Sequence, residues 1–257
     1  MPWSPDQYLR YADERSRPFF DLTARIGATA PTDVVDLGCG PGNLTATLAE
    51  RWPQARIHGI DSSAEMIAAA RAEHPTSRIT FACEDLRLWA EQGADVDVLI
   101  SNATLQWVPE HRALLPALVE KVRPGGWLAF QVPGNHQALS HALCRELAAE
   151  QPYAPFTGDV VYRPTGDPAD YFADLRPLGL EVEAWETTYL HALRGPDAVF
   201  EWVSATGARP YIEAVGSEVR REFVAEYKRR LAAAYPERDG VVLFPFRRIF
   251  VVAHRSM

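Results

Sequence analysis

The stretch Asp36-Leu37-Gly38-Cys39-Gly40-Pro41-Gly42-Asn43 decides how the rest of the sequence is organised. Its first residues end a short run of β-branched and apolar residues at 33–37, and its three glycines stop that run abruptly. Glycine lets a backbone turn tightly and lets a ligand approach without meeting a Cβ atom. Open α/β sheets bind ligands beyond the carboxyl ends of their strands, so the stretch predicts a binding loop after the first strand.

Strand-like and helix-like patterns alternate on the carboxyl side of this loop. Residues 43–52 repeat Leu44, Leu48 and Trp52 every four positions, which indicates a helix. Further strands are predicted at 56–60, 79–82, 96–100 and 127–132, with helices at 64–73 and 112–121 and a turn at 123–126. This alternation is typical of a parallel sheet with helices on both faces.

The pattern changes after Pro133. Helices are predicted over 136–151, 170–175 and most of 196–235, a loop over 152–168, and strands over 180–189 and 246–253. We expect one α/β domain over residues 1–257, with a Rossmann-like, seven-stranded, mostly parallel sheet sandwiched by helices. The insertions 133–176 and 195–235 are expected to form a helical lid. A further helix is predicted to start at Ser4-Pro5-Asp6.

Composition excludes several classes of protein. Of 257 residues, 47% are hydrophobic and 23% charged, as in ordinary globular proteins. The net charge of -8 argues against a nucleic-acid partner, which would require a broad basic face. The three cysteines lack metal-ligand spacing, so we expect no metal site, and their number suits a reducing compartment. We find neither a signal peptide nor a run of about 18 apolar residues, and therefore expect a cytoplasmic protein without a membrane partner.

The spacing of the glycine loop separates two classes of cofactor. Dinucleotide-binding loops have the pattern G-x-G-x-x-G, and the third glycine would fall at position 43, which is Asn43. Asp36, two residues before the first glycine, would repel a pyrophosphate but suits the ammonium group of an amino acid. Asp61 ends the second strand, where a carboxylate can accept hydrogen bonds from both ribose hydroxyls. NAD enzymes also bind the ribose with an acidic residue at this position. Asp61 therefore indicates a cofactor with a nucleoside but does not distinguish NAD from other nucleoside cofactors.

This loop resembles the first motif of class I methyltransferases. The resemblance implies S-adenosyl-L-methionine as cofactor and S-adenosylhomocysteine as its product. It also implies that Met66 packs near the adenine, that Asp85 meets the adenine amino group, and that Asn102 faces the cofactor's amino group and methyl. The cofactor-binding residues are then Asp36, Gly38, Cys39, Gly40, Gly42, Asp61, Ser62, Met66, Asp85, Leu86 and Asn102.

Similarity to one family extends over nearly the whole chain. The sequence resembles the bacterial trans-aconitate methyltransferases, and the loop 152–168 lies outside the matching stretches. Among the matching stretches, those around Arg17 and over 202–210 are more specific for the family than the cofactor motifs. The matching stretches are Tyr8-Leu9, 14–18, 36–43, 59–63, Leu105-Gln106-Trp107, Thr187-Thr188-Tyr189 with His191, Trp202-Val203, Ala205-Thr206-Gly207 and Arg209-Pro210.

The resemblance implies methyl transfer to one carboxylate of trans-aconitate, a small tricarboxylate, with a monomethyl ester as product. A carboxylate is already ionised at pH 7, so no catalytic base is expected. Arginines suit the remaining carboxylates because they donate paired hydrogen bonds. The expected substrate-binding residues are Tyr8, Arg17, Gln106, Trp107, His191, Trp202, Arg209 and Arg248, with Tyr211 as a further pocket wall.

Three other functions stay open at this point. A methyltransferase acting on another small acid or on a hydroxyl is one, and with a hydroxyl acceptor His191 would have to serve as base. A NAD-linked oxidoreductase is disfavoured by Asn43. A cofactor-binding regulator without catalysis would be indicated by an acceptor pocket that is closed or lacks arginine.

Overall fold

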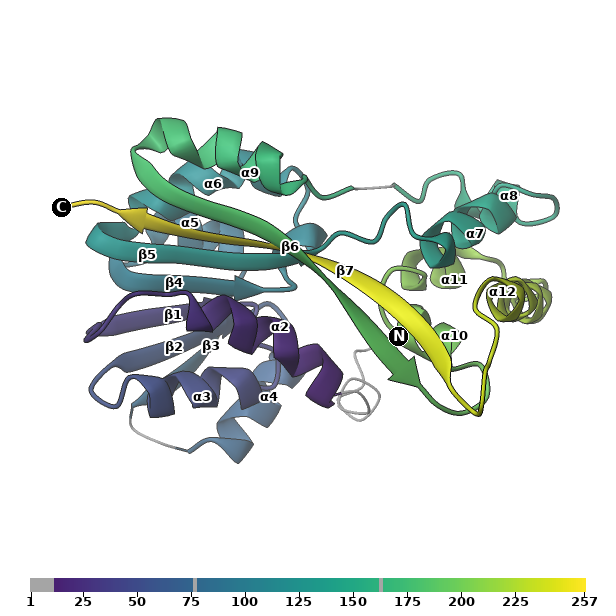
Figure 1. Ribbon diagram of the computed structural model, residues 1–257, viewed down its shortest axis with the longest axis horizontal. Helices are drawn as coiled ribbons and strands as arrows, with labels where there is room; N and C mark the ends of the chain where they lie inside the picture. Colours follow the sequence, from purple (N-terminus) through teal and green to yellow (C-terminus); the bar gives the residue numbers. More distant parts are fainter. Residues whose placement is uncertain (1–11, 76–77, 162–163) are drawn as a thin grey trace. The chain divides into compact units, whose positions relative to one another are not determined.

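A seven-stranded sheet forms the framework of the protein. The structure, a computed structural model, describes residues 12–75, 78–161 and 164–257. The strand order is β3-β2-β1-β4-β5-β7-β6 (Figure 1). The strands are β1 Asp33–Leu37, β2 Arg56–Asp61, β3 Ile79–Cys83, β4 Val96–Asn102, β5 Val122–Pro133, β6 Leu180–Leu193 and β7 Val242–Arg255. The predicted seven-stranded, mostly parallel sheet is therefore confirmed.

Strand β1 is buried along its whole length because it lies inside the sheet. It pairs in parallel with β2 on one side and with β4 on the other, so that Asp36 lies beside Gly59 and Ile100. The strand order reverses at this point, since β2 and β3 continue to one side and β4 and β5 to the other. The carboxyl ends of β1 and β4 therefore border the crevice where sheets of this kind bind ligands.

Helices cover both faces of the sheet. On one face, α2 (Ala12–Ala24) packs against β5, while α3 (Asn43–Arg51) and α4 (Ala64–Glu73) pack against β2. On the other face, α6 (His111–Glu120) packs against β5, α5 (Leu86–Gln92) and α9 (Pro168–Leu175). The core of this second face includes Leu99, Phe130 and Leu175, all fully buried.

Two stretches differ from the sequence prediction. Strand β5 starts at Val122, five residues before the predicted start, because Val122 already pairs with Val96 of β4. Residues 123–126 form an irregularity in the strand, and regular pairing resumes at Trp127 with Val98. Helix α9 was expected within the lid, yet Tyr171 and Leu175 are fully buried in the core of the sheet. The last strand, β7, runs antiparallel to β5 and makes the sheet mixed.

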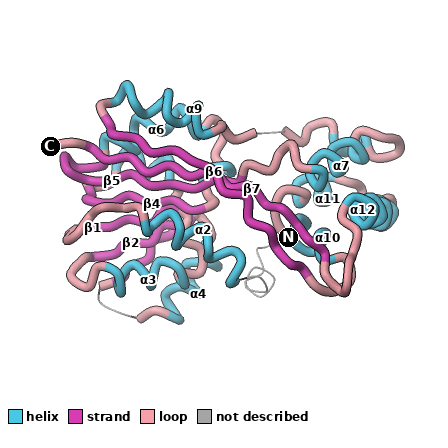
Figure 2. The backbone as a smooth tube through the Cα atoms, viewed as in Figure 1, coloured by secondary structure: helices cyan, strands magenta, loops and turns pink. Residues whose placement is uncertain are grey.

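The chain divides into two compact units. Unit 1 contains the described residues up to Pro133 together with Thr165–Thr187 and Arg248–Met257, and unit 2 contains Gly134–Pro164 and Thr188–Arg247. These bounds differ from the expected insertions 133–176 and 195–235, since 165–176 belongs to unit 1 and unit 2 includes the ends of both long strands. Figure 2 shows the mainly helical composition of unit 2: α7 Leu139–Ala148, α8 Ala154–Thr157, α10 Ala198–Ser204, α11 Arg209–Ala214 and α12 Arg220–Ala234.

Unit 2 has its own core. Helix α12 packs against α7, and the Tyr227 hydroxyl donates to the Ser140 carbonyl at 2.7 Å. Trp202 and Phe244 are 1% exposed and lie edge to face. No helix among the described residues is long and apolar enough to cross a membrane. The predicted helix start at Ser4-Pro5-Asp6 lies outside the described residues.

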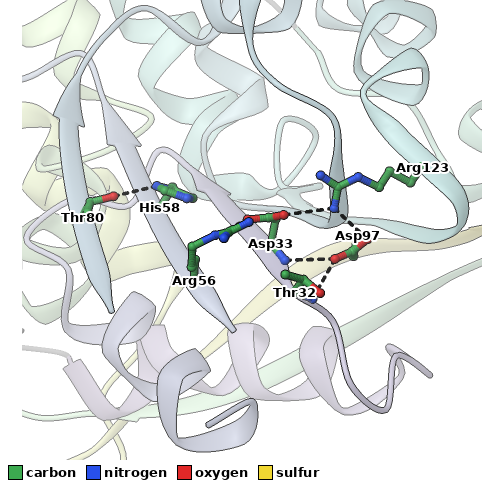
Figure 3. Close-up of polar contacts among 7 residues, drawn as sticks. All are labelled: Thr32, Asp33, Arg56, His58, Thr80, Asp97 and Arg123. Atoms are coloured by element: carbon green, nitrogen blue, oxygen red, sulfur yellow. Dashed lines mark hydrogen bonds and ion pairs between the residues drawn. The ribbon is translucent and has the colours of Figure 1, made fainter. Parts of the chain in front are cut away.

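A cluster of charged residues ties the amino ends of β1, β4 and β5 together (Figure 3). The Asp97 Oδ2 atom accepts from the amides of Thr32 and Asp33 at 2.7 and 2.9 Å. Arg123 bridges Asp33 and Asp97 at 3.0 Å to each, and Arg56 donates to Asp33 at 2.7 Å. Because this cluster lies at the opposite edge from the glycine loop, it supports the sheet without taking part in the site.

Electrostatics in this cluster favour the ionised carboxylates. Burial raises the pKa of Asp97, but the hydrogen bonds from the Asp33 amide and Arg123 outweigh it, and the net pKa is lowered from 3.8. A carboxylate with a lowered pKa in the folded protein stabilises the fold above its ordinary pKa. That stabilisation is lost as the pH falls through the lowered value.

Replacing Asp97 should therefore destabilise the protein in a pH-dependent way. Asp97→Ala is expected to lower the free energy of unfolding by about 1–2 kcal/mol at pH 7, since the amides of Thr32 and Asp33 lose their acceptor. The lost ion pair with Arg123 adds little, because it is partly exposed to solvent. Urea unfolding at pH 7 and near pH 3 measures this, and the difference from the parent should shrink at the acidic pH. Asp95→Ala, on the exposed residue two positions earlier, is the matched control. Equal stability of the two variants at pH 7 would contradict this role for Asp97.

Candidate functional site

The glycine loop turns directly over the end of β2. The amides of Gly38 and Cys39 both donate to the Ile60 carbonyl, at 2.6 and 3.0 Å. Gly42 then precedes α3 with φ 82°, in the left-handed region. The loop therefore connects the carboxyl end of β1 to the amino end of α3 while its backbone stays fixed to the neighbouring strand.

Two glycines of the loop are required for different reasons. Gly38 has φ +80°, and a Cβ atom there would collide with the Thr104 side chain. Gly40 has φ +55°, and a Cβ atom there would meet nothing within 4 Å. Gly38 is thus needed for packing of the loop against the end of β4, whereas Gly40 borders open space that a ligand can use.

Asp36 is a buried carboxylate at the end of β1. It is 3% exposed, and its Oδ2 atom accepts from Thr45 Oγ1 of α3 at 2.6 Å. Burial raises the pKa of Asp36 to about 6; the hydrogen bond from Thr45 opposes this and the charge of Asp61 adds to it. Ionised Asp36 is thus costly in the ligand-free protein, and a bound cation would relieve that cost.

Asp61 has a structural task as well as a candidate binding role. Its two oxygens accept from the amides of Gly40 and Ser63, at 3.0 and 2.8 Å. The carboxylate therefore holds the glycine loop to the turn after β2, where Ser62 is exposed. Each oxygen keeps a further lone pair for a ligand hydroxyl. In the described part of the chain, no Lys or Arg side chain pairs with Asp36 or Asp61.

Two further predicted cofactor residues, Cys39 of the loop and Met66 of α4, are buried. Ser63 caps α4 by accepting from the Met66 amide at 3.3 Å, and Met66 itself is 5% exposed. Burial raises the pKa of the Cys39 thiol, and the charges of Asp36 and Asp61 raise it further. Cys39 is therefore protonated at neutral pH and does not act as a nucleophile.

Asp85 has its own partner. It caps α5, and its oxygens accept from the Arg87 amide, Nε and Nη2 at 2.8, 3.0 and 2.6 Å. Hydrogen bonds from the Arg87 side chain and amide lower the pKa of Asp85 to about 2. The carboxylate is thus held after β3 by Arg87, and its contact with an adenine amino group stays a prediction. Leu86 beside it packs against the core.

The carboxyl end of β4 borders the glycine loop from the other side. Ser101 Oγ donates to the Leu37 carbonyl at 3.0 Å, which joins the ends of β4 and β1. Ala103 follows in the left-handed region with φ 55°, a strained conformation of the kind that concentrates at functional sites. The buried Asn102 Oδ1 atom has no hydrogen-bond partner among the described residues, so it is available as an acceptor.

These features fit a ligand with a cationic tail and hydroxyl groups. Asp36 and Asp61 supply negative charge at the ends of β1 and β2, and Asn102 adds an acceptor that has no partner among the described residues. A pyrophosphate would meet this negative charge directly. The site therefore favours a nucleoside that carries an ammonium group over a dinucleotide.

The predicted acceptor residues are divided between the two units. Tyr8 lies outside the described residues. In unit 1, Arg17 is exposed on α2, Trp107 is 43% exposed, and Arg248 on β7 is 7% exposed. Gln106 donates through Nε2 to the Ala103 carbonyl at 2.5 Å, next to Asn102.

In unit 2, His191 and Trp202 are more deeply buried than the predicted acceptor residues of unit 1. His191 is 2% exposed, and its ring centroid lies 4.6 Å from that of Trp202 and 6.1 Å from that of Phe246. Arg209 begins α11 and pairs with Glu213 at 3.0 Å, while Tyr211 is half-buried on the same helix. Their roles as substrate contacts stay predictions.

Sequence reasoning missed two polar residues of unit 1. Thr45 looks like an ordinary helix residue, and only the structure shows that it donates to Asp36. Gln131 lies in the predicted strand 127–132 and is 0% exposed, with its Oε1 atom 3.4 Å from Arg248 Nη1. A glutamine inside an apolar strand was the available signal.

Comparison with known proteins agrees with this geometry. A family described as "Methyltransferase domain" matches residues 34–126. The fold is similar to the geranyl diphosphate C-methyltransferase from Streptomyces coelicolor A3(2), with TM-score 0.55 and 14% identity, covering 97% of this chain and 82% of that one. It is also similar to the plantazolicin methyltransferase BpumL, with TM-score 0.55 and 13% identity over 99% and 91% of the chains. Both of those structures contain S-adenosylhomocysteine.

Relatives at much higher identity narrow the family. The trans-aconitate 2-methyltransferase of Streptomyces avermitilis is 48% identical over 99% of this chain and 97% of its own. That of Mycobacterium sp. (strain KMS) is 49% identical over 98% of both chains. The chain belongs to the trans-aconitate 2-methyltransferase family. The family resemblance predicted from the sequence is confirmed, and the Rossmann-like methyltransferase fold with it.

Substitutions in the glycine loop should separate packing from ligand access. Gly38→Ala is expected to destabilise the protein by about 2–4 kcal/mol, because left-handed strain adds to the collision with Thr104. Gly40→Ala, the matched variant, should cost about 1–2 kcal/mol, since it carries the strain alone. Urea unfolding without ligand measures both. A larger loss in Gly40→Ala than in Gly38→Ala would contradict the assigned roles.

Proposed function

We propose that this protein transfers the methyl group of S-adenosyl-L-methionine to one carboxylate of trans-aconitate, giving a monomethyl ester and S-adenosylhomocysteine. The main support for trans-aconitate as the methyl acceptor is the 48% identity, over 99% of the chain, with the trans-aconitate 2-methyltransferase of Streptomyces avermitilis. The cofactor is supported by the acidic residues at the ends of β1 and β2. The S-adenosylhomocysteine named with two proteins of the same fold supports it further.

The proposed cofactor site uses residues of unit 1. Asp36 would attract the ammonium group, with Asn102 Oδ1 as a second acceptor, and Asp61 would accept from the ribose hydroxyls. The backbone at Gly38, Gly40 and Gly42 would border the tail, with Gly40 leaving the open space beside it. Met66 and Leu86 would pack against the adenine, with Asp85 toward its amino group; Cys39 and Ser62 complete the proposed contacts.

The reaction needs orientation rather than a base. Bound S-adenosylmethionine supplies a sulfonium methyl group that a nucleophile can attack. A carboxylate is ionised throughout the neutral range, so no proton has to leave. Holding the two groups in line replaces a bimolecular encounter, and excluding water strengthens the effect.

Negative charge on the acceptor has to be matched by cations. We assign the carboxylates of trans-aconitate to Arg17, Arg209 and Arg248, which can each donate paired hydrogen bonds. Gln106 and Trp107 in unit 1, and Tyr8, His191, Trp202 and Tyr211, are the remaining proposed contacts.

The inserted segments of unit 2 are proposed as a lid. One segment follows the carboxyl end of β5 and precedes α9, and the other lies between the parts of β6 and β7 that belong to unit 1. Excluding water is the contribution that such an insertion can make to a charge-neutralising reaction. We place the enzyme in the cytoplasm, where the thiols of Cys39, Cys83 and Cys144 would stay reduced.

Incubation with S-adenosylmethionine and a panel of small acids tests the function. Trans-aconitate should gain the mass of one methyl group and should release methanol in alkali, because esters hydrolyse and methyl ethers do not. S-adenosylhomocysteine should raise the melting temperature by mass action, while NAD should not. An alkali-stable product would instead favour a hydroxyl acceptor. Stabilisation by NAD alone would contradict the methyltransferase.

A further inference from the structure

Unpartnered amide atoms gather at the carboxyl ends of β4 and β5. Asn102 Oδ1, Gln106 Oε1 and Gln131 Nε2 are buried, and none has a hydrogen-bond partner among the residues that the structure describes. A buried polar atom without a partner is destabilising, because it has lost its hydrogen bonds to water and gained none in the protein. Gln131 is the most enclosed of the three residues, since it is 0% exposed. Three such atoms at one edge indicate a place where a polar ligand completes the hydrogen bonds.

The sheet register places these residues on the same face as Asp36. Asp36 pairs with Ile100 and Asn102 pairs with Gln131, and side chains two residues apart on a strand share a face. Arg248 pairs with Pro133, two residues beyond Gln131, and therefore shares that face as well. Asp36, Asn102, Gln131 and Arg248 thus form a row across β1, β4, β5 and β7.

Arg248 fixes the orientation of the Gln131 amide. Its Nη1 atom lies 3.4 Å from Gln131 Oε1. A guanidinium can only donate hydrogen bonds, so the oxygen of the amide has to face Arg248. The Gln131 NH₂ group then points away from the guanidinium, and within the described parts of the chain it is the donor of the row that has no acceptor.

We propose that Gln131 Nε2 donates a hydrogen bond to the acceptor carboxylate that receives the methyl group, and this rests on the proposed function. The row begins at the acidic cofactor site on β1 and reaches Gln131 one strand beyond Asn102, about 4.8 Å away across paired strands. An acceptor bound at Gln131 is therefore next to the proposed position of the cofactor's tail and methyl group.

A neutral donor suits this carboxylate better than a second arginine. One carboxylate oxygen forms a bond to the methyl carbon while the carbon–sulfur bond breaks and its electron pair stays on sulfur. The negative charge of the acceptor and the positive charge of the sulfonium disappear together, and no proton is released. A cation on the reacting carboxylate would stabilise the charge before transfer more than during it. The neutral Gln131 amide can orient the second oxygen of the carboxylate while stabilising its charge before transfer less than an arginine would.

Two variants of nearly equal size test the proposal. Gln131→Met removes the donor, and Gln131→Glu replaces it with an oxygen while keeping an acceptor for Arg248. If Gln131 orients the reacting carboxylate, kcat for trans-aconitate should fall about 10- to 100-fold in Gln131→Met. It should fall further in Gln131→Glu, because two anions repel each other. The KM for S-adenosylmethionine and the melting temperature with S-adenosylhomocysteine should change little.

A merely structural role predicts the opposite order. If Gln131 only accepts from Arg248, Gln131→Glu should preserve activity better than Gln131→Met. That order overturns the proposal, as does a rise in the acceptor KM with unchanged kcat in both variants. Thr80→Val on β3, where Thr80 contacts His58 at 2.6 Å, is the control and should match the parent.

The parent protein separates this proposal from the proposed function. If it methylates another acid of the panel instead of trans-aconitate, only the named acceptor fails, and the variants are compared on that acid. If it methylates no carboxylate, both proposals are overturned. If the parent is active on trans-aconitate and the variants equal it, Gln131 alone is excluded.

Discussion

The buried carboxylate of Asp36 is the constraint around which the site is arranged. It ends a strand that is buried along its whole length, so water cannot stabilise its charge. Burial raises its pKa to about 6, and Thr45 supplies one compensating hydrogen bond. Carboxyl groups with such raised pKa values concentrate at functional sites. A bound cationic group would lower the free-energy cost of ionising Asp36.

The sheet places the proposed cofactor site and the proposed acceptor site side by side. The glycine loop is fixed to Ile60 by two amides and to Asp61 by a third, so the loop and the acidic pair form one rigid edge. The same face continues through Asn102 to Gln131. In this account, charge attraction holds the donor at β1 and neutral amides orient the acceptor at β4 and β5.

Much of the fold could be predicted because local patterns determine it. The alternation of strands and helices around 36–43 identified the strands of the sheet, and the G-x-G-x-G spacing indicated a methyltransferase, the family that the comparisons show. The early start of β5 was missed because Pro124-Gly125-Gly126 has turn composition, although its neighbours pair as a strand. Gln131 stands out in sequence as a glutamine inside an apolar strand, but its proposed role could not be predicted, since that role depends on the register with Asn102 and on the distant Arg248.

Proton release on binding is the most direct measurement of the central claim. Calorimetry of S-adenosylhomocysteine binding near pH 6, in buffers of different ionisation enthalpy, should show release of about half a proton as the ammonium group lowers the pKa of Asp36. Asp36→Asn should abolish this release, and methylthioadenosine, which lacks the amino-acid tail, should show little. Equal proton release by both ligands, or release that survives in Asp36→Asn, would contradict the account.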